Sequence, residues 1–164
     1  PASVLLGHSD GVALTRLHAG AEQPVRGLIV EAPHVFVEEH GGHGIRAAGD
    51  AFRNTDLPQK LGKHHRDAAK TFHGWYDVWM SGEFPKWNIE ASLSGIHCPV
   101  MCIQGEDDAY GTMAQLDAIA RQVGGPCELV KLADCGHTPH KEQPEKTLAA
   151  VTRFVQLILE KDFA

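Results

Sequence analysis

A serine between two glycines lies near the start of the chain, in the stretch GHSDG over residues 7–11. An apolar run precedes it and a helix-like run follows, so the pattern predicts a sharp turn from a strand into a helix with Ser9 at its apex. A serine hydroxyl becomes a nucleophile only when a base accepts its proton and an acid orients that base. Without such partners, the same stretch is an ordinary strand-to-helix turn.

A candidate acid and a candidate base follow two later strand-like runs. Asp108 closes the stretch GEDD after one run, and His137 closes the stretch ADCGH after the other. The carboxyl ends of parallel strands meet at one edge of a sheet. We therefore expect Ser9, Asp108 and His137 to lie together there, with Asp107 as the second choice for the acid.

Strand-like and helix-like runs alternate at both ends of the chain. Apolar runs of strand length span residues 2–6, 25–30, 99–104 and 127–132, and helix-like runs span residues 11–19, 112–123 and 144–159. Strands separated by helices predict parallel pairing with right-handed crossover connections. The sequence therefore predicts an α/β fold with a parallel sheet and crossover helices.

Both later helices have start signals and an apolar face. Thr112 and Gln115 form the pattern of a capping box, and Pro144 suits the first turn of the last helix. The faces expected to be buried comprise Met113, Leu116, Ile119, Ala120 and Val123 in the first of these helices, and Leu148, Val151, Val155, Ile158 and Leu159 in the second.

The middle of the chain interrupts this alternation. It carries a helix-like stretch over residues 67–80, breaks at Pro58, Gly82 and Pro85, and all three tryptophans. We therefore expect a helical cap inserted into the fold. This divides the chain into core residues 1–35, a cap over residues 36–96 and core residues 97–164.

Four residues are candidates for the surroundings of Ser9. Trp75 and Trp79 of the cap would wall an apolar pocket for an acyl group, or simply pack the cap onto the core. His8 would contact the substrate, with a packing role as its alternative. Glu31, at the end of the second strand, either lines the same crevice or is a solvated charge.

Together these motifs resemble those of the α/β-hydrolase fold family. The stretch GHSDG is similar to the family's nucleophile elbow, QGEDD to its acid loop, and GH before the last helix to its histidine loop. The resemblance implies that Ser9 is the nucleophile, His137 the general base and then acid, and Asp108 the residue that orients the imidazole. It implies that the backbone N–H of Asp10 is one oxyanion donor and that no metal or organic cofactor takes part. A serine in the elbow separates the chain from members that use aspartate there, such as haloalkane dehalogenases.

One part of the family's pattern is missing. In the family, several strands precede the elbow, and a His-Gly loop from that region supplies a second oxyanion donor. This chain begins at Pro1 with the elbow strand itself. We therefore expect a fragment or truncated product, completed by an upstream segment or by self-association at the unpaired edge strand.

The composition excludes several classes of partner. The chain has 164 residues and a net charge of −6, which speaks against nucleic acid and anionic membrane surfaces. No apolar run approaches the length of a membrane span, and no signal peptide is recognisable. Four cysteines without paired spacing predict reduced thiols in a cytoplasmic protein.

Eleven histidines raise the question of a metal site. The stretches HGGH over residues 40–43 and HTPH over residues 137–140 each place two histidines three positions apart. Neither histidine pair has an obvious third ligand at a suitable spacing. In the second pair, the intervening Pro139 argues against both imidazoles lying on one face of a helix. We therefore expect no metal.

The sequence thus predicts a serine hydrolase that acts through an acyl-enzyme on a small ester, thioester or related carbonyl substrate. An acyltransferase of the same fold and a non-catalytic binding protein on the same scaffold are the alternatives.

Overall fold

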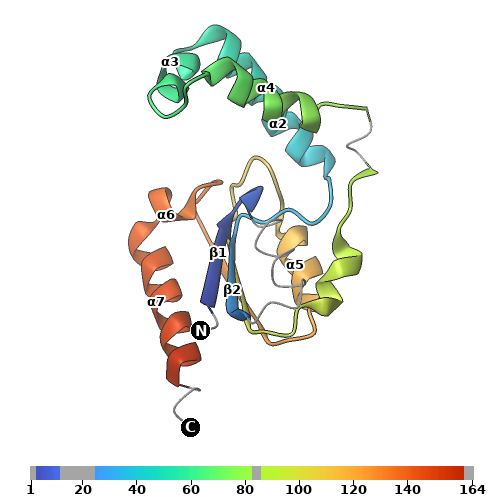
Figure 1. Ribbon diagram of the computed structural model, residues 1–164, viewed down its shortest axis with the longest axis vertical. Coiled ribbons are helices and arrows are strands. Elements are labelled where there is room, and N and C mark those ends of the chain that lie inside the picture. Colours follow the sequence, from blue (N-terminus) through green and yellow to red (C-terminus); the bar gives the residue numbers. More distant parts are fainter. Residues whose placement is uncertain (1–2, 12–24, 83–85, 161–164) are drawn as a thin grey trace.

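Four parallel strands form one sheet in the order β1-β2-β3-β4 (Figure 1). The computed structural model describes residues 3–11, 25–82 and 86–160. The strands are β1 (Ser3–His8), β2 (Val25–Glu31), β3 (Val100–Gly105) and β4 (Cys127–Leu132). The predicted class, a parallel sheet with crossover helices, is confirmed. Of the helix predicted over residues 11–19, all but Gly11 lies outside the described residues.

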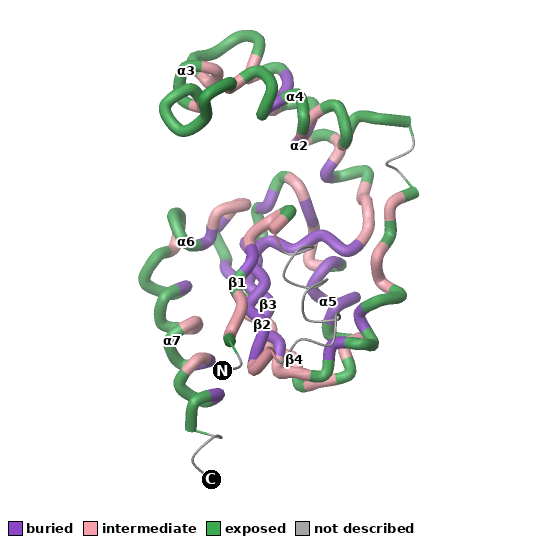
Figure 2. Tube along the Cα trace, viewed as in Figure 1, coloured by how far each residue is buried: buried purple, intermediate pink, exposed green. Residues whose placement is uncertain are grey.

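Helices cover both faces of the sheet, because its central strands are apolar on both sides. In Figure 1, α5 (Met113–Gln122) and α7 (Pro144–Glu160) flank the strands from opposite sides. The core on the α5 side includes Leu28, Val30, Val100, Cys102, Leu116 and Ile119, and the core on the α7 side includes Ile29, Met101, Ile103, Phe154 and Ile158. Buried residues accordingly follow the central strands β2 and β3 in Figure 2.

The start of α5 corrects one prediction. Thr112 is the N-cap, since its hydroxyl oxygen accepts the Ala114 N–H at 3.2 Å. The Gln115 side chain does not return to Thr112; it donates to Glu38 at 2.6 Å and to the Phe36 carbonyl oxygen at 3.1 Å. Glu38 completes the cap instead, because its carboxylate accepts the Thr112 backbone N–H at 2.9 Å. Burial raises the pKa of Glu38, but the hydrogen bonds from Thr112 and Gln115 outweigh burial and leave this pKa lowered.

The buried faces of α5 and α7 also differ from the prediction. Ala120 is exposed, and Ala118 is buried in its place. Leu148 and Leu159 of α7 are 67% and 44% exposed, whereas Phe154 is 5% exposed. The helix turns the side that carries Phe154 toward the sheet, so apolar residues on its other sides stay in contact with solvent.

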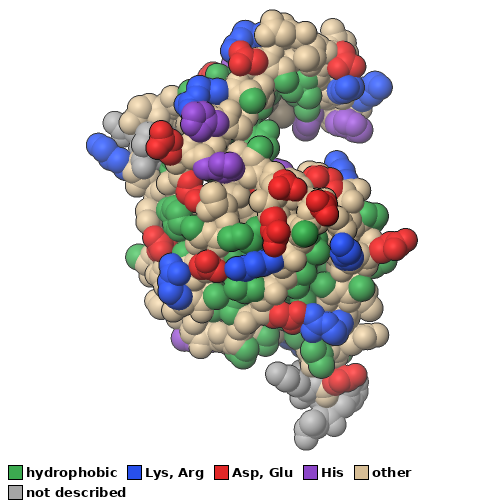
Figure 3. Space-filling view, turned by 180° about the vertical axis from the view of Figure 1, so that it is seen from behind, with side chains coloured by type: hydrophobic (Ala, Val, Ile, Leu, Met, Phe, Trp, Pro, Cys, Tyr) green, Lys and Arg blue, Asp and Glu red, His purple; other side chains and the backbone are tan. Residues whose placement is uncertain are grey.

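The helices that follow β2 form a layer above the carboxyl ends of the strands (Figure 1). These helices are α2 (Glu39–Asn54), α3 (Leu57–Gly62) and α4 (Ala68–Trp79), and the 3-10 helix η2 (Glu90–Gly95) leads back to β3. Phe52 of α2 stacks on Phe72 of α4 with ring centroids 4.0 Å apart. Most of this layer is exposed (Figure 2), and Figure 3 shows a hollow between it and the sheet-forming body.

The cysteines are all free thiols. The sulfur atoms of Cys102 and Cys127, on neighbouring strands, are 3.9 Å apart, which is a hydrogen-bond contact between two thiols and not a disulfide. None of the described helices is long and apolar enough to cross a membrane.

α2 begins in direct contact with the loop after β3. A Cβ atom on Gly41 would overlap the Tyr110 carbonyl oxygen, and one on Gly44 would overlap the Ala109 carbonyl oxygen. Glycine at both positions therefore allows the backbone of the loop to touch the helix.

Alanine substitutions at two neighbouring glycines of α2 should have opposite effects. Gly41→Ala should lower the free energy of unfolding by about 1–3 kcal/mol, because the new methyl group overlaps backbone that must move. Gly42→Ala should raise it by up to about 1 kcal/mol, because alanine favours a helix over glycine and its Cβ would lie 3.5 Å from the nearest atom, in Arg46. Urea unfolding measures both; equal effects would contradict the close contact.

Candidate active site

Three turns at the carboxyl edge of the sheet have a strained backbone. Ser9, Ala32 and Asp134 follow strand ends with φ angles of 54°, 48° and 53°, a region that non-glycine residues seldom adopt. Such conformations cost about 1–3 kcal/mol each and persist where the surrounding structure holds them. Here the Ser9 N–H donates to the Glu31 carbonyl oxygen at 2.9 Å, and the Ala32 N–H donates to the Ile103 carbonyl oxygen at 2.8 Å. Each of these two turns is thus tied to the neighbouring strand.

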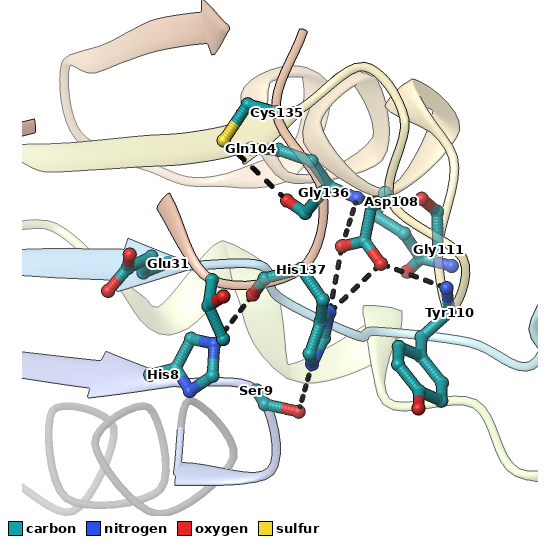
Figure 4. Close-up of polar contacts among 12 residues, drawn as sticks. His8, Ser9, Glu31, Gln104, Asp108, Tyr110, Gly111, Cys135, Gly136 and His137 are labelled. Carbon is teal, nitrogen blue, oxygen red and sulfur yellow. Dashed lines mark hydrogen bonds and ion pairs between the residues drawn. The ribbon is translucent and has the colours of Figure 1, made fainter. Parts of the chain in front are cut away.

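The three residues predicted from strand ends form one chain of contacts in which His137 lies between Ser9 and Asp108 (Figure 4). His137 Nε2 is 2.9 Å from Ser9 Oγ, and His137 Nδ1 is 2.9 Å from both carboxylate oxygens of Asp108. The Asp108 side chain is fully buried, and 18% of the His137 side chain is exposed. When Nδ1 donates its proton to the ionised Asp108, Nε2 is left to accept the hydroxyl proton of Ser9.

Asp108, and not Asp107, faces the histidine. The Oδ1 atom of Asp108 accepts the Tyr110 backbone N–H at 2.8 Å, and Oδ2 accepts from Gln104 Nε2 at 3.2 Å. Gln104 is completely buried and also donates to the Gly111 carbonyl oxygen at 2.8 Å. Asp107 is exposed. One buried amide therefore holds both the carboxylate and the loop that carries it.

The loop around His137 is held from two directions. The predicted pocket residue His8 brings its Nε2 to 2.8 Å from the His137 carbonyl oxygen. On the other side, the Glu142 carboxylate accepts the Gly136 N–H at 2.7 Å and the Thr138 N–H at 2.9 Å. The Thr138 hydroxyl donates to Glu142 as well, and this hydrogen bond, followed by the two backbone ones, lowers the pKa of Glu142.

Glu31 is buried and paired, which decides against a solvated charge. It is 3% exposed, and its Oε1 accepts both the His140 backbone N–H at 2.7 Å and His140 Nδ1 at 2.9 Å. His140 begins the short helix α6 (Pro139–Glu142), directly after the histidine loop. The His8 ring lies between the two, with centroids 5.1 Å from His137 and 5.2 Å from His140. Glu31 thus fixes the far end of the loop.

A cavity of about 220 Å³ lies beside Ser9 and His137. The remaining residues of its lining are His8, Asp10, His34, Ile45, Trp75, Trp79 and Tyr110. Of the four side chains considered for the surroundings of Ser9, those of His8, Trp75 and Trp79 line this cavity and that of Glu31 does not; Asp10, expected to contribute its backbone N–H, lines it as well. The Tyr110 ring packs on His137, with centroids 4.6 Å apart.

The two histidine pairs considered for a metal have separate partners. His40 Nε2 is 2.9 Å from the Asp108 carbonyl oxygen, and His43 Nδ1 is 3.2 Å from an Arg46 nitrogen. His137 and His140 face Asp108 and Glu31 as described. Among the described residues, no group of three or more histidine, cysteine or carboxylate side chains is placed to hold a metal ion.

Sequence reasoning missed several residues that shape the site. Gln104 is a polar residue at the end of an otherwise apolar run, and this break in the pattern is a signal that could have identified it. Glu142 lies four positions after Thr138, but its contact with the histidine loop has no distinctive sequence pattern. His34, at the cavity, follows the end of the second strand at the same sheet edge as Ser9, which is a usable signal.

Removal of the Gln104 amide should make the position of the Asp108 carboxylate less fixed. Gln104→Met keeps a similar volume but leaves the Gly111 carbonyl oxygen without its donor and Asp108 with one donor fewer. We expect the reaction rate of Ser9 with a fluorophosphonate to fall about 10- to 100-fold, as for loss of a buried hydrogen bond to a charged group. Gln122→Met, whose amide contacts Glu90 far from the site, serves as control. An unchanged rate in folded Gln104→Met would argue against this role.

Solved structures of larger proteins share this fold. An esterase from Pyrococcus furiosus has a TM-score of 0.68 at 16% identity, and the match covers 93% of this chain and 53% of the esterase. A serine hydrolase involved in carbazole degradation has a TM-score of 0.69 at 18% identity, with 94% and 63% covered. A proline iminopeptidase from Mycobacterium smegmatis has a TM-score of 0.66 at 17% identity, with 94% and 65% covered. At these identities the likeness concerns the fold, and the chain spans about half to two thirds of the lengths of these proteins.

Sequence comparison leads to a family. No curated protein matches the chain. The model of the Alpha/beta hydrolase family, however, matches residues 1–151, which is nearly the whole chain and includes Ser9, Asp108 and His137. With the parallel sheet and the similar solved structures, this match shows that the chain belongs to the alpha/beta hydrolase family.

Proposed function

We propose that the chain carries the catalytic triad of a serine hydrolase that cleaves a small ester, thioester or related carbonyl substrate. The observation that supports this most directly is the continuous hydrogen-bond chain from Ser9 Oγ through both ring nitrogens of His137 to the buried carboxylate of Asp108. A serine that serves only as a turn residue needs no such chain. The strained φ of Ser9 is a second support, since it presents the hydroxyl group at the cavity.

The proposed reaction follows from these contacts. Ser9 Oγ attacks the substrate carbonyl carbon while His137 Nε2 takes the hydroxyl proton, and Asp108 stabilises the imidazolium that forms. The imidazolium then protonates the leaving group, and an acyl-enzyme remains on Ser9. Water attacks the acyl-enzyme with His137 again as base, which releases the acid and restores the serine.

The negatively charged oxygen of the tetrahedral intermediates needs hydrogen-bond donors from the protein. The Ser9 N–H is occupied by the Glu31 carbonyl oxygen, so the backbone N–H of Asp10 is the donor that we assign from the turn itself. Each donor of this kind is worth roughly 3–4 kcal/mol of transition-state stabilisation.

Helices of the layer above the sheet line one side of the cavity. Trp75 and Trp79 of α4 and Ile45 of α2 line the cavity from above, opposite the strand ends. We propose that residues 36–96 act as a cap that excludes water and selects substrates by shape. The core is then formed by residues 1–35 and 97–164.

Labelling with a fluorophosphonate probe tests the nucleophile directly. We expect stoichiometric labelling of Ser9, because the probe reacts with serines that an adjacent base activates. Ser9→Ala should abolish labelling, whereas Ser81→Ala, at an exposed position after α4, should not alter it. Mass spectrometry identifies the labelled peptide. A folded chain in which Ser9 stays unlabelled would instead support a non-catalytic binding protein.

Product analysis distinguishes hydrolysis from transfer. With an activated ester and an added alcohol or amine, a hydrolase releases mainly the free acid, and an acyltransferase releases the new ester or amide.

A second proposal concerns the edge of the sheet. Among the described strands, β1 is an edge strand that pairs only with β2, and its Leu6 is 53% exposed. A groove of about 460 Å³ runs between β1 and α7, and its lining combines apolar side chains such as Leu6, Leu148 and Val151 with His8, Glu31, His140 and Thr147. We propose that this edge pairs with a further polypeptide strand, from a preceding segment or from a second copy of the chain.

Size-exclusion chromatography with light scattering tests the pairing in the chain as given. We expect concentration-dependent self-association that Leu148→Glu weakens, because a charge would be placed in the apolar groove. Val78→Glu replaces another exposed apolar residue, at 49% exposure on the helical layer, and should leave association unchanged. A monomer at all concentrations would refute pairing between copies.

A further inference from the structure

His34 is a buried polar side chain at the cavity beside Ser9, and its contacts within the described part of the protein are ring contacts. It is 6% exposed and lines the cavity together with Ser9 and His137. Its ring centroid lies 5.9 Å from that of His137 and 5.3 Å from that of Trp79. Both neighbours are ring contacts, and no described residue forms a hydrogen bond with the His34 imidazole. His34 is not among the residues with fully buried unpaired polar atoms, so its imidazole keeps contact with the open cavity, where a ligand can form the hydrogen bond that the protein does not supply.

The backbone holds His34 in place from both sides. Ala32 precedes it in a left-handed conformation that is tied to β3 through Ile103. Val35 follows it, and the Val35 N–H donates to the buried Gln115 side chain at 2.8 Å. Gly111 faces the ring, since a Cβ there would lie 3.1 Å from a ring carbon of His34. The imidazole is thus presented to the cavity by a rigid frame.

Burial, followed by the nearby His137, lowers the pKa of His34. The imidazole is therefore neutral near pH 7 and offers one N–H donor and one nitrogen acceptor. A neutral ring at this position has two consequences. It does not repel the imidazolium of His137, and it can bind a hydroxyl or carbonyl group of an uncharged ligand.

The rest of the cavity limits what that ligand is. Its described lining contains no lysine or arginine to pair with a carboxylate, and Asp10 adds a negative charge at its edge. Ile45, Trp75 and Trp79 provide apolar and aromatic surface. A cavity of about 150 Å³ in another protein holds benzene, so about 220 Å³ here accommodates one ring with a small substituent.

We propose that the cavity binds an uncharged acyl group with a single ring, and that His34 hydrogen-bonds to a polar substituent on that ring. His34 is then a specificity-determining residue that selects hydroxyl-bearing acyl groups over apolar ones of equal size. This inference rests on the proposed function for the identity of the group as an acyl group. The binding itself does not depend on catalysis.

Binding of non-hydrolysable amides tests the inference without turnover. In Ser9→Ala, quenching of tryptophan fluorescence reports binding of 3- and 4-hydroxybenzamide and of the corresponding methylbenzamides. We expect at least one hydroxyl compound to bind about tenfold more tightly than its methyl counterpart. His34→Leu in the same background should reduce this ratio to about one, and His34→Gln should retain part of it, because an amide still donates and accepts.

Controls separate this inference from its alternatives. His64→Leu, at an exposed position after α3, should leave the ratio unchanged. Ratios near one for both pairs in Ser9→Ala, or a ratio that persists in His34→Leu, would overturn the inference. Failure of probe labelling at Ser9 would remove the proposed hydrolase function but would leave the amide-binding ratios as they are.

In the active chain, 4-nitrophenyl esters of the same hydroxyl- and methyl-substituted benzoic acids provide the second readout. We expect the ratio of kcat/KM values to follow the ratio of amide affinities, and His34→Leu to abolish it while Ser9 is still labelled. A preference in turnover that His34→Leu does not change would also count against the assignment.

Discussion

The strands that carry Ser9 and His137 are not neighbours, and the site depends on the loop that crosses between them. β1 and β4 stand at opposite edges of the described sheet, and three strand spacings amount to about 14 Å. Ser9 Oγ and His137 Nε2 are nevertheless 2.9 Å apart. The loop after β4 therefore has to run over the ends of β3 and β2 and stop at one defined point above β1.

Contacts along this path determine where the loop stops. Over β3, Gly105 leaves no space for a side chain, because a Cβ there would overlap the Cys135 carbonyl oxygen. Over β2, the buried Glu31 binds the start of α6 through His140. At β1, His8 contacts the backbone of the histidine loop itself. Each strand that the loop crosses thus contributes one interaction, and these interactions lie within one residue of the strand ends.

Local pattern was sufficient to predict the sheet and the meeting of the three site residues, because apolar runs and strand-end motifs depend on neighbouring residues only. The supporting contacts were not accessible in this way. The capping-box rule predicted that the Gln115 side chain contacts the backbone of Thr112. It could not predict the contact with Glu38, which lies 77 residues earlier in the sequence. Leu148 was expected to be buried because it is apolar, but contact with the sheet selects the face of a helix. Gln104 could have been noticed as a polar residue in an apolar strand, although its partner Asp108 is defined only by the folded loop.

The contact between α2 and the acid loop divides the helical layer into a root and an outer part. The first turn of α2 touches the backbone next to Asp108 through Gly41 and Gly44, so any rotation of that turn would carry the carboxylate with it. α4 instead stacks on α2 through Phe72 and meets the core through ring contacts such as that of Trp79 with His34, and α3 contacts both helices. Side-chain changes in the outer helices would therefore reshape the cavity roof without moving the backbone next to Asp108.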